Sequence, residues 1–190
     1  MRKVMLAATL ALAFTMAAAR VAVAAPATAT TVDLNGYANF SSILGGGMGG
    51  PVALSGAVSD GQLGALRGEA NFPLRDEKIT ISATSSIALI TEQLNVSWYR
   101  YNCTPFGCFF EQGFSVFERS SGSGPVDIRL GSLKGTGSIS LGTTATCVSA
   151  CPPPGAYWYA PYAYWQVQGA VLSSQDAGQL NMYGNAVTIH

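Results

Sequence analysis

The four cysteines are the residues of this chain whose spacing constrains its chemistry most directly. Cys103 and Cys108 form one close pair, and Cys147 and Cys151 form a second. Their spacings, C-x4-C and C-x3-C, differ from the paired C-x2-C knuckles of zinc sites, so no metal site is predicted. An even number of cysteines in an exported chain indicates disulfides instead. We therefore expect two disulfides.

The pairing of these cysteines is left open by their count, because four cysteines allow three connectivities. Local pairing is favoured, since Thr104-Pro-Phe-Gly107 has the composition of a tight turn and would bring Cys103 opposite Cys108. In an extended strand Cys147 and Cys151 would lie about 13 Å apart, so a bond between them requires a turn. The alternative is crossed pairing of the two cysteine pairs, Cys103 with Cys151 and Cys108 with Cys147.

A run of aromatic residues after the second cysteine pair is the candidate binding site. Three consecutive prolines at 152–154 exclude both a helix and a central strand. Amphipathic aromatic side chains dominate surfaces that bind other molecules, so we expect the loop 156–165 to bind a glycan or an extracellular protein surface. The alternative is that the rings cap an open end of a sheet and are mostly buried. The six residues are Tyr157, Trp158, Tyr159, Tyr162, Tyr164 and Trp165.

The catalytic inventory of the chain is nearly empty. Its single histidine, His190, is the last residue and is a poor candidate for the imidazole of a Ser-His-Asp triad. No G-x-S-x-G elbow, H-E-x-x-H, Walker or dinucleotide motif occurs, so neither an enzyme nor a cofactor is predicted. The enzymatic alternative is a small glycoside-active enzyme, which needs only two carboxylates across a cleft. Its candidates are Glu69, Glu92, Glu111 and Glu118.

A secreted protease inhibitor is the other alternative function. Such a protein presents a constrained loop, because a loop that is already ordered loses less entropy on binding. The two segments that could serve are 104–107 and 152–154.

The N-terminal residues 1–24 have the composition of a secretory signal peptide. Met1-Arg2-Lys3 is basic, the run from Val4 to Ala19 is apolar, and Ala22-Val23-Ala24 carries the small residues that precede a cleavage site. The apolar run is short for a membrane span. We expect a secreted, periplasmic or extracellular protein with one domain at 25–190 and no membrane span in the mature chain.

The charge of the chain excludes nucleic acid as a partner. Charged residues make up 11% of the sequence, against about 25% in typical domains, and ten basic residues cancel ten acidic ones. Removing residues 1–24 takes away three basic residues and leaves a formal charge of −3. An outer-membrane barrel is disfavoured because the apolar strand faces carry glycine and alanine where lipid would require large side chains.

The mature chain shows the period of β-strands throughout. Val32, Leu34, Ala38 and Phe40 share one face, and polar residues occupy the other. The string L-x-G-x-A-N-F occurs at 34–40 and again at 66–72, and glycine at such a position indicates tight, curved sheet packing. The fold class is therefore all-β: a single antiparallel β-sandwich or small, partly open β-barrel of about 8–10 strands with two disulfides.

The register of one hairpin can be predicted from the turn at 104–107. Closing the chain there opposes two charges and covers a glycine with an aromatic ring, and such cross-strand pairs each contribute about 0.2–1 kcal/mol. The predicted pairs are Cys103 with Cys108, Arg100 with Glu111, Trp98 with Gly113, and Leu94 with Phe117.

Two irregular segments complete the prediction. Ser120-Ser-Gly-Ser-Gly-Pro125 has the composition of a flexible loop. The alternation that begins at Val126 changes phase near Gly131-Ser132, which we interpret as a β-bulge.

Overall fold

The structure, a computed structural model, describes residues 30–73, 75–159 and 161–190; the predicted signal peptide at 1–24 lies outside them. Within the described residues the chain forms twelve strands and no helix, so no helix there is long and apolar enough to cross a membrane. The strands are β1 (Thr30–Ser42), β2 (Gly47–Ser59), β3 (Gln62–Leu63), β4 (Leu66–Phe72), β5 (Arg75–Ala83), β6 (Ile90–Thr104), β7 (Gly107–Leu130), β8 (Leu133–Gly142), β9 (Thr146–Ser149), β10 (Tyr157–Trp158), β11 (Tyr164–Leu172) and β12 (Ala177–Ile189).

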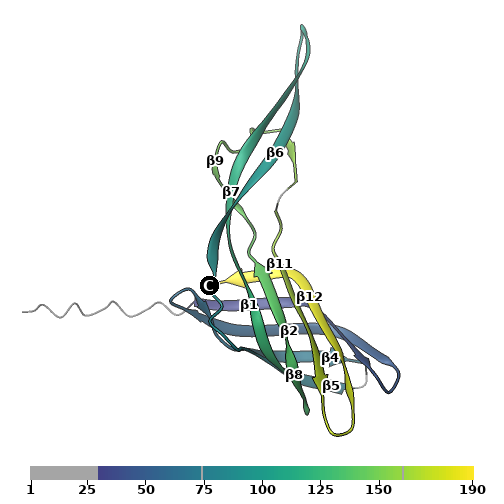
Figure 1. The fold of residues 1–190 in the computed structure, drawn as a ribbon. Helices are drawn as coiled ribbons and strands as arrows, with labels where there is room; N and C mark the ends of the chain where they lie inside the picture. Colours follow the sequence, from purple (N-terminus) through teal and green to yellow (C-terminus); the bar gives the residue numbers. More distant parts are fainter. Residues whose placement is uncertain (1–29, 74, 160) are drawn as a thin grey trace, which may run out of the picture.

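Eight of these strands close into a ring. The order is β1-β2-β4-β5-β7-β8-β11-β12, and β12 pairs again with β1. The second half of β7 closes the ring because it pairs with β5 on one side and with β8 on the other (Figure 1). All pairings are antiparallel and neighbours follow chain order, so the predicted all-β antiparallel fold is confirmed in its barrel form. The strand total exceeds the predicted 8–10 because β3, β9 and β10 are short additions outside the ring.

The interior of the barrel is a packed hydrophobic core. The predicted inward face of β1 is confirmed, since Val32, Leu34, Ala38 and Phe40 are at most 1% exposed. Each fully buried aliphatic or aromatic side chain of this kind contributes about 1.5–3 kcal/mol. The core also contains Leu54, Leu66, Phe72, Ile79, Ile81, Ile128, Leu130, Ile139, Leu141, Trp165, Val167, Val171, Leu180 and Met182.

Gly36, in the repeated string, shows why small residues line part of this barrel. A methyl group at Gly36 would overlap the Tyr183 carbonyl and lie 2.8 Å from Cζ2 of Trp165. The same string in β4 brings Gly68 against the backbone of Ala53. The repeated glycines therefore mark close approach of neighbouring strands and a large core side chain.

The segment 84–89 crosses one end of the barrel as a plug. Ile87 is buried, and Leu89 donates its backbone N–H to the Gly61 carbonyl at 2.7 Å. A methyl group at Gly124 would lie 2.7 Å from Cγ1 of Ile87. The prediction of a flexible loop at 120–125 is wrong, because these small residues lie within β7, where their lack of bulk lets the plug pack against the strand.

The predicted bulge near Gly131-Ser132 is also wrong. These two residues form the hairpin turn between β7 and β8, with Leu130 opposite Leu133 and Gly131 at φ +56°. A two-residue turn places residues three apart in sequence on the same face, which produces the phase change that the alternation showed.

Candidate functional site: the aromatic arm

A two-stranded arm projects from the barrel. It consists of β6 and the first half of β7, which pair over residues 90–104 and 107–121 (Figure 1). The predicted register is confirmed at each of its four pairs, which are Cys103 with Cys108, Arg100 with Glu111, Trp98 with Gly113, and Leu94 with Phe117.

Both disulfides lie in or beside this arm, and both are local. Cys103–Cys108 closes the tip, and Cys147–Cys151 closes a loop at the base, as predicted. Because the two bonds join neighbours in sequence, the crossed pairing is excluded. Disulfides of this kind are formed in oxidising compartments.

One face of the arm, which we name the inner face, is covered by the segment 143–159. Strand β9 pairs with β7 at one edge, β10 pairs with β6 at the other, and the chain between them crosses the inner face. Ser115 is buried there and donates its hydroxyl to the Ala150 carbonyl at 2.6 Å. The ring of Phe117 is buried 5.0 Å from that of Trp158. The base of the arm therefore has a small core of its own.

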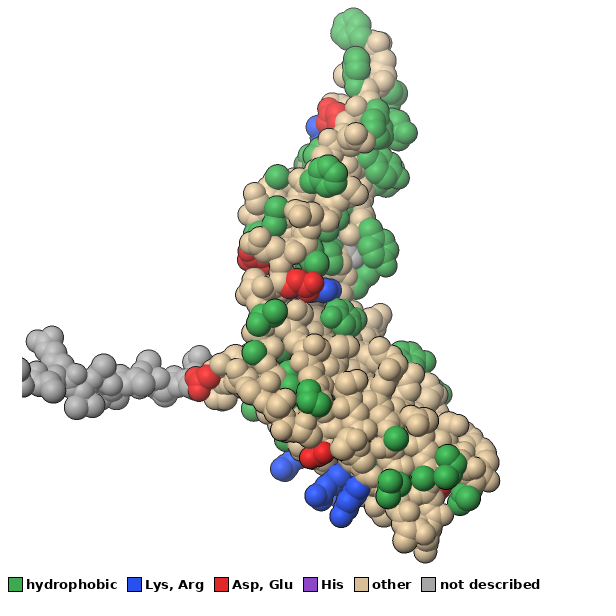
Figure 2. All heavy atoms as spheres, in the orientation of Figure 1, with side chains coloured by type: hydrophobic (Ala, Val, Ile, Leu, Met, Phe, Trp, Pro, Cys, Tyr) green, Lys and Arg blue, Asp and Glu red, His purple; other side chains and the backbone are tan. Residues whose placement is uncertain are grey.

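The opposite face, which we name the outer face, carries an exposed run of aromatic rings. Figure 2 shows hydrophobic side chains gathered along the arm. Tyr99 occupies the middle of the run and contacts the rings of Tyr157 at 5.5 Å and Phe110 at 6.2 Å. Phe110 in turn contacts Tyr101 at 5.4 Å. The rings of the outer face are Tyr99, Tyr101, Phe110, Phe114 and Tyr157, and they are 46–73% exposed.

The mutual packing of these rings decides what they present to solvent. The planes of Tyr99 and Tyr157 lie 24° apart, and those of Tyr99 and Phe110 lie 30° apart, so the rings stack on one another. Stacked rings cover each other's faces and turn their edges and phenolic hydroxyls outward. The stacked rings of Tyr157, Tyr99 and Phe110 therefore present mainly their edges and the two phenolic hydroxyls to solvent. Beside Phe114 the outer face is hollowed by a cavity of about 200 Å³ lined also by Tyr99 and Gln112.

The tip of the arm presents one further aromatic side chain. Phe106 is 95% exposed in the turn that follows Thr104. The Thr104 hydroxyl accepts a hydrogen bond from the backbone N–H of Phe106 and donates one to the Gly107 carbonyl, both at 3.2 Å. The turn is thus held by its own threonine and by the disulfide behind it.

The six aromatic residues predicted as a binding loop are divided among four environments. Trp165 is 1% exposed in the barrel core, where Nε1 donates to the Asn35 carbonyl at 3.0 Å, so it is not a surface residue. Tyr157 joins the outer face and Trp158 packs on the inner face. The remaining three stay exposed near the base: Tyr159 and Tyr162 make an edge contact at 5.6 Å, and Tyr164 lies 5.0 Å from the Arg119 guanidinium.

Four of the five outer-face rings were missed from the sequence. The signal was nevertheless present, because the hairpin register that pairs Trp98 with Gly113 also places Tyr99, Tyr101, Phe110 and Phe114 together on the other face. The density of aromatic residues in 156–165 drew attention to that segment. The outer-face rings become visible only when the residues of the two hairpin strands are paired and assigned to faces.

The candidate carboxylates each have a local partner. Arg119 Nε lies 2.8 Å from Glu92 and Arg100 Nε lies 2.5 Å from Glu111. The hydrogen bond from each arginine lowers the pKa of its glutamate below the ordinary value. Glu118 accepts from the Gln93 amide at 2.7 Å, and Glu69 lies opposite Lys78 on the barrel. A general acid needs a raised pKa, and the arginines beside Glu92 and Glu111 shift the pKa of these two groups in the opposite direction.

The remaining candidate groups for chemistry are few. His190 lies at the end of β12, where its backbone pairs with Thr31 and its Nε2 lies 3.3 Å from a carboxylate oxygen of Asp33. Among the described residues, no cluster of three or more histidine, cysteine or carboxylate side chains could hold a metal ion.

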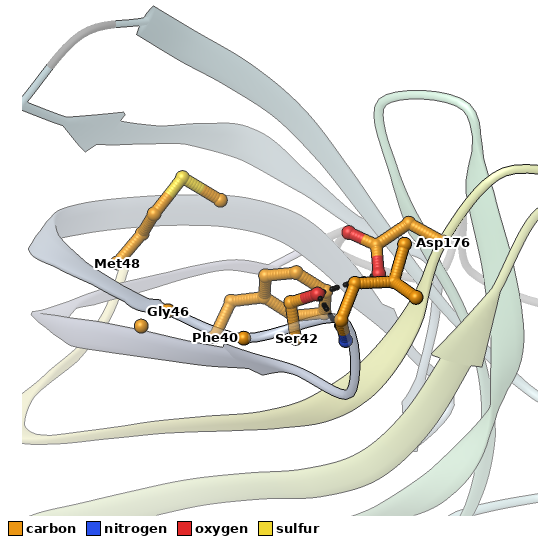
Figure 3. Close-up of a pocket in the computed structure, with 8 residues that line it drawn as sticks. Phe40, Ser42, Gly46, Met48 and Asp176 are labelled. Atoms are coloured by element: carbon orange, nitrogen blue, oxygen red, sulfur yellow. Dashed lines mark hydrogen bonds between the residues drawn. The ribbon is translucent and has the colours of Figure 1, made fainter.

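A pocket of about 460 Å³ lies at the turn end of the barrel, away from the arm. It lies between the β1–β2 turn and Asp176, with Phe40 and Met48 on its wall (Figure 3). The Asp176 carboxylate accepts hydrogen bonds from the Ser42 hydroxyl at 2.6 Å and from the Ala177 N–H at 2.7 Å. The bond from Ser42 ties the β1–β2 turn to the β11–β12 turn, which is a structural role.

The chain matches no protein-family model, no curated protein and no solved structure.

Proposed function

We propose that this chain is an exported, non-catalytic protein that binds the surface of another protein through the outer face of its arm. The observation that carries the proposal is the run of five exposed aromatic rings on a projecting hairpin. Soluble proteins seldom expose contiguous apolar patches of this kind unless the patch is an interaction site. Tyrosine is moreover enriched in interfaces, because it supplies a large contact area and a hydroxyl at low entropic cost.

The chemistry of the outer face favours a protein partner over a glycan. Sugar rings bind aromatic side chains by lying flat on them, whereas the stacked rings of Tyr157, Tyr99 and Phe110 cover one another's faces. Ring edges and phenolic hydroxyls suit the mixed apolar and polar surface of a protein. The three exposed tyrosines at 159, 162 and 164 extend the same character toward the base.

Two independent features support export. Residues 1–24 have the composition of a signal peptide, and the chain carries two disulfides with no free cysteine among the described residues. The non-catalytic assignment rests on Glu92 and Glu111, whose pKa values are lowered by their arginine partners, and on the sparse set of catalytic residue types.

Surface plasmon resonance on the immobilised exported chain tests this proposal. Envelope and secreted proteins of the producing organism are passed over the wild type and over Tyr99→Ser/Phe110→Ser, which removes two central rings. The matched control is Tyr37→Ser/Tyr183→Ser, because these tyrosines form an exposed pair on the barrel at 6.5 Å.

We expect the arm variant to lose at least ten-fold in affinity for its protein ligand and the barrel variant to keep wild-type affinity. Equal binding by the wild type and the arm variant would contradict the proposal. A glycan array probed with the same variants completes the test, and glycan binding that depends on Tyr99 and Phe110 would replace the protein partner with a carbohydrate.

The arm tip supports a second candidate function, a protease inhibitor. Phe106 is almost fully exposed on a turn that a disulfide constrains, and a constrained loop loses little entropy when it binds. The other segment considered, 152–154, packs at the base of the arm with its first two prolines half-buried. Inhibition of secreted proteases that cleave after aromatic residues, lost in Phe106→Gly, would establish this function.

A further inference from the structure

The outer face of the arm is aromatic and almost free of charge. Its only charged side chain among the described arm residues is Glu118, which lies at the base and accepts a hydrogen bond from Gln93. The four charged groups of the two ion pairs, Arg100 with Glu111 and Arg119 with Glu92, occupy the inner face. A strongly charged partner would therefore find no complementary charge on the outer face, whereas an identical face would meet no charge repulsion at its centre.

The distal half of the arm lacks neighbouring strands that would stabilise it. Beyond β9 and β10, residues 100–111 form a two-stranded ribbon, and no described residue adds a third strand on either side. An isolated two-stranded ribbon is marginally stable in water. The disulfide and the ion pair between Arg100 and Glu111 hold the two strands together, but neither of them covers the rings.

The area of the outer face matches what a pair of arms would need. A large aromatic side chain covers about 150–250 Å², so the exposed parts of the five rings come to about 600 Å². Two such faces together would bury about 1,200 Å², which is the lower end of the range for specific protein interfaces. A self-complementary face is also what a two-fold symmetric dimer requires, because each residue then meets the same surface on the partner.

We propose that the partner of the arm is a second copy of this chain, and that two arms pack antiparallel, outer face on outer face, in a two-fold dimer. This inference rests on the proposed function and names the protein that the aromatic surface binds. Phe110 contacts both Tyr99 and Tyr101, and the proposed packing places it near the two-fold axis. A charge placed at residue 110 would then approach its own copy in the partner.

Sedimentation velocity of the exported chain over a concentration series is the first measurement. We expect the wild type to form a dimer with a dissociation constant in the micromolar range, in keeping with a small interface. Phe110→Lys and Phe110→Glu, measured separately, should each raise that constant about 30-fold or more, as loss of a central aromatic anchor does. Tyr183→Lys, which places the same charge on the exposed barrel surface, should leave it unchanged.

Mixing the two charged variants separates a lost interface from a lost fold. An equimolar mixture of Phe110→Lys and Phe110→Glu should form a heterodimer, because opposite charges then meet where like charges repelled. A wild type that stays monomeric would overturn the dimer and leave the proposed function intact if ring-dependent binding to another protein persists. A wild-type dimer that neither variant weakens, or a mixture that stays monomeric, would also overturn it. Loss of both self-association and ring-dependent binding would remove the proposed function as well.

Discussion

The indole of Trp98 lies directly over Gly113 on the neighbouring strand of the arm. A methyl group at residue 113 would come within 2.6 Å of Cζ2 and 2.8 Å of Cε2 of this indole. The space left by the missing side chain of Gly113 is thus filled by the indole of Trp98 from the neighbouring strand. This indole packs on the inner face at the base of the arm.

Substituting this glycine should displace the ring. Gly113→Ala is expected to destabilise the arm by about 1–3 kcal/mol, because overpacking forces the indole off its position. Tryptophan fluorescence and hydrogen exchange at β6 and β7 would report the change. Gly47→Ala is the matched control, since its nearest neighbour would be the Phe40 carbonyl at 3.7 Å. Equal exchange in both variants would show that Trp98 does not depend on the glycine.

Removal of the tip disulfide should loosen the arm without unfolding the barrel. In Cys103→Ser/Cys108→Ser we expect the arm to lose about 2 kcal/mol, the value that loop-closure entropy gives for so short a loop. Hydrogen exchange would quicken at residues 100–111, while protection of the barrel strands should stay as it is. A fall in barrel protection would show that the arm and barrel unfold together.

Acid should weaken the arm through its two ion pairs. The arginine hydrogen bonds lower the pKa of Glu92 and of Glu111 in the folded chain below the ordinary value of 4.5. The unfolded chain therefore binds protons first as the pH falls, so this contribution is complete above about pH 4.5 and is lost as the pH passes through the lowered pKa values.

Arm exchange rates measured between pH 6 and pH 3 would check this dependence. The effect should be modest, because the groups are partly exposed to water. Glu92→Gln/Glu111→Gln should abolish the part of the pH dependence that belongs to the arm. A double variant that retains the wild-type profile would assign it to other carboxylates.

Trp165 should behave as a core residue. Trp165→Ala removes a fully buried indole together with its hydrogen bond to the Asn35 carbonyl, and we expect a loss of about 3–5 kcal/mol in the free energy of unfolding. Urea denaturation measures the loss. Trp158→Ala, which truncates a partly exposed tryptophan on the arm, should cost the barrel much less. Similar losses in the two variants would contradict the division between barrel core and arm.

The sequence predicts which residues pair across a hairpin far better than it predicts which strands close the barrel. Alternation assigns the inward face of β1 correctly, and the turn at 104–107 together with opposed charges specifies every tested pair of the arm. Both are local properties that depend on a period of two residues. Which strand closes the ring depends on pairings distant in sequence, such as that of β1 with β12, and alternation carries no information about these partners.

The same distinction explains the mixed outcome for the aromatic segment. Tyr164 and Trp165 are neighbours in sequence, yet one is exposed and the other is in the core, because successive residues of β11 point to opposite faces. Trp165 is in phase with Val167 and Val171, which are buried with it. Composition alone suggested that the six rings form one loop. The alternation of side chains along a strand instead places neighbouring rings on different faces.

Strand β7 runs without interruption from the tip of the arm into the wall of the barrel, and at Ser121 it is paired on both sides, with Ile90 and with Gly142. No unpaired linker separates the two parts at this point. A force that pulls on the tip would therefore be transmitted along the backbone of β7 into the barrel. The hydrogen bonds between β7 and its neighbouring strands would resist that force.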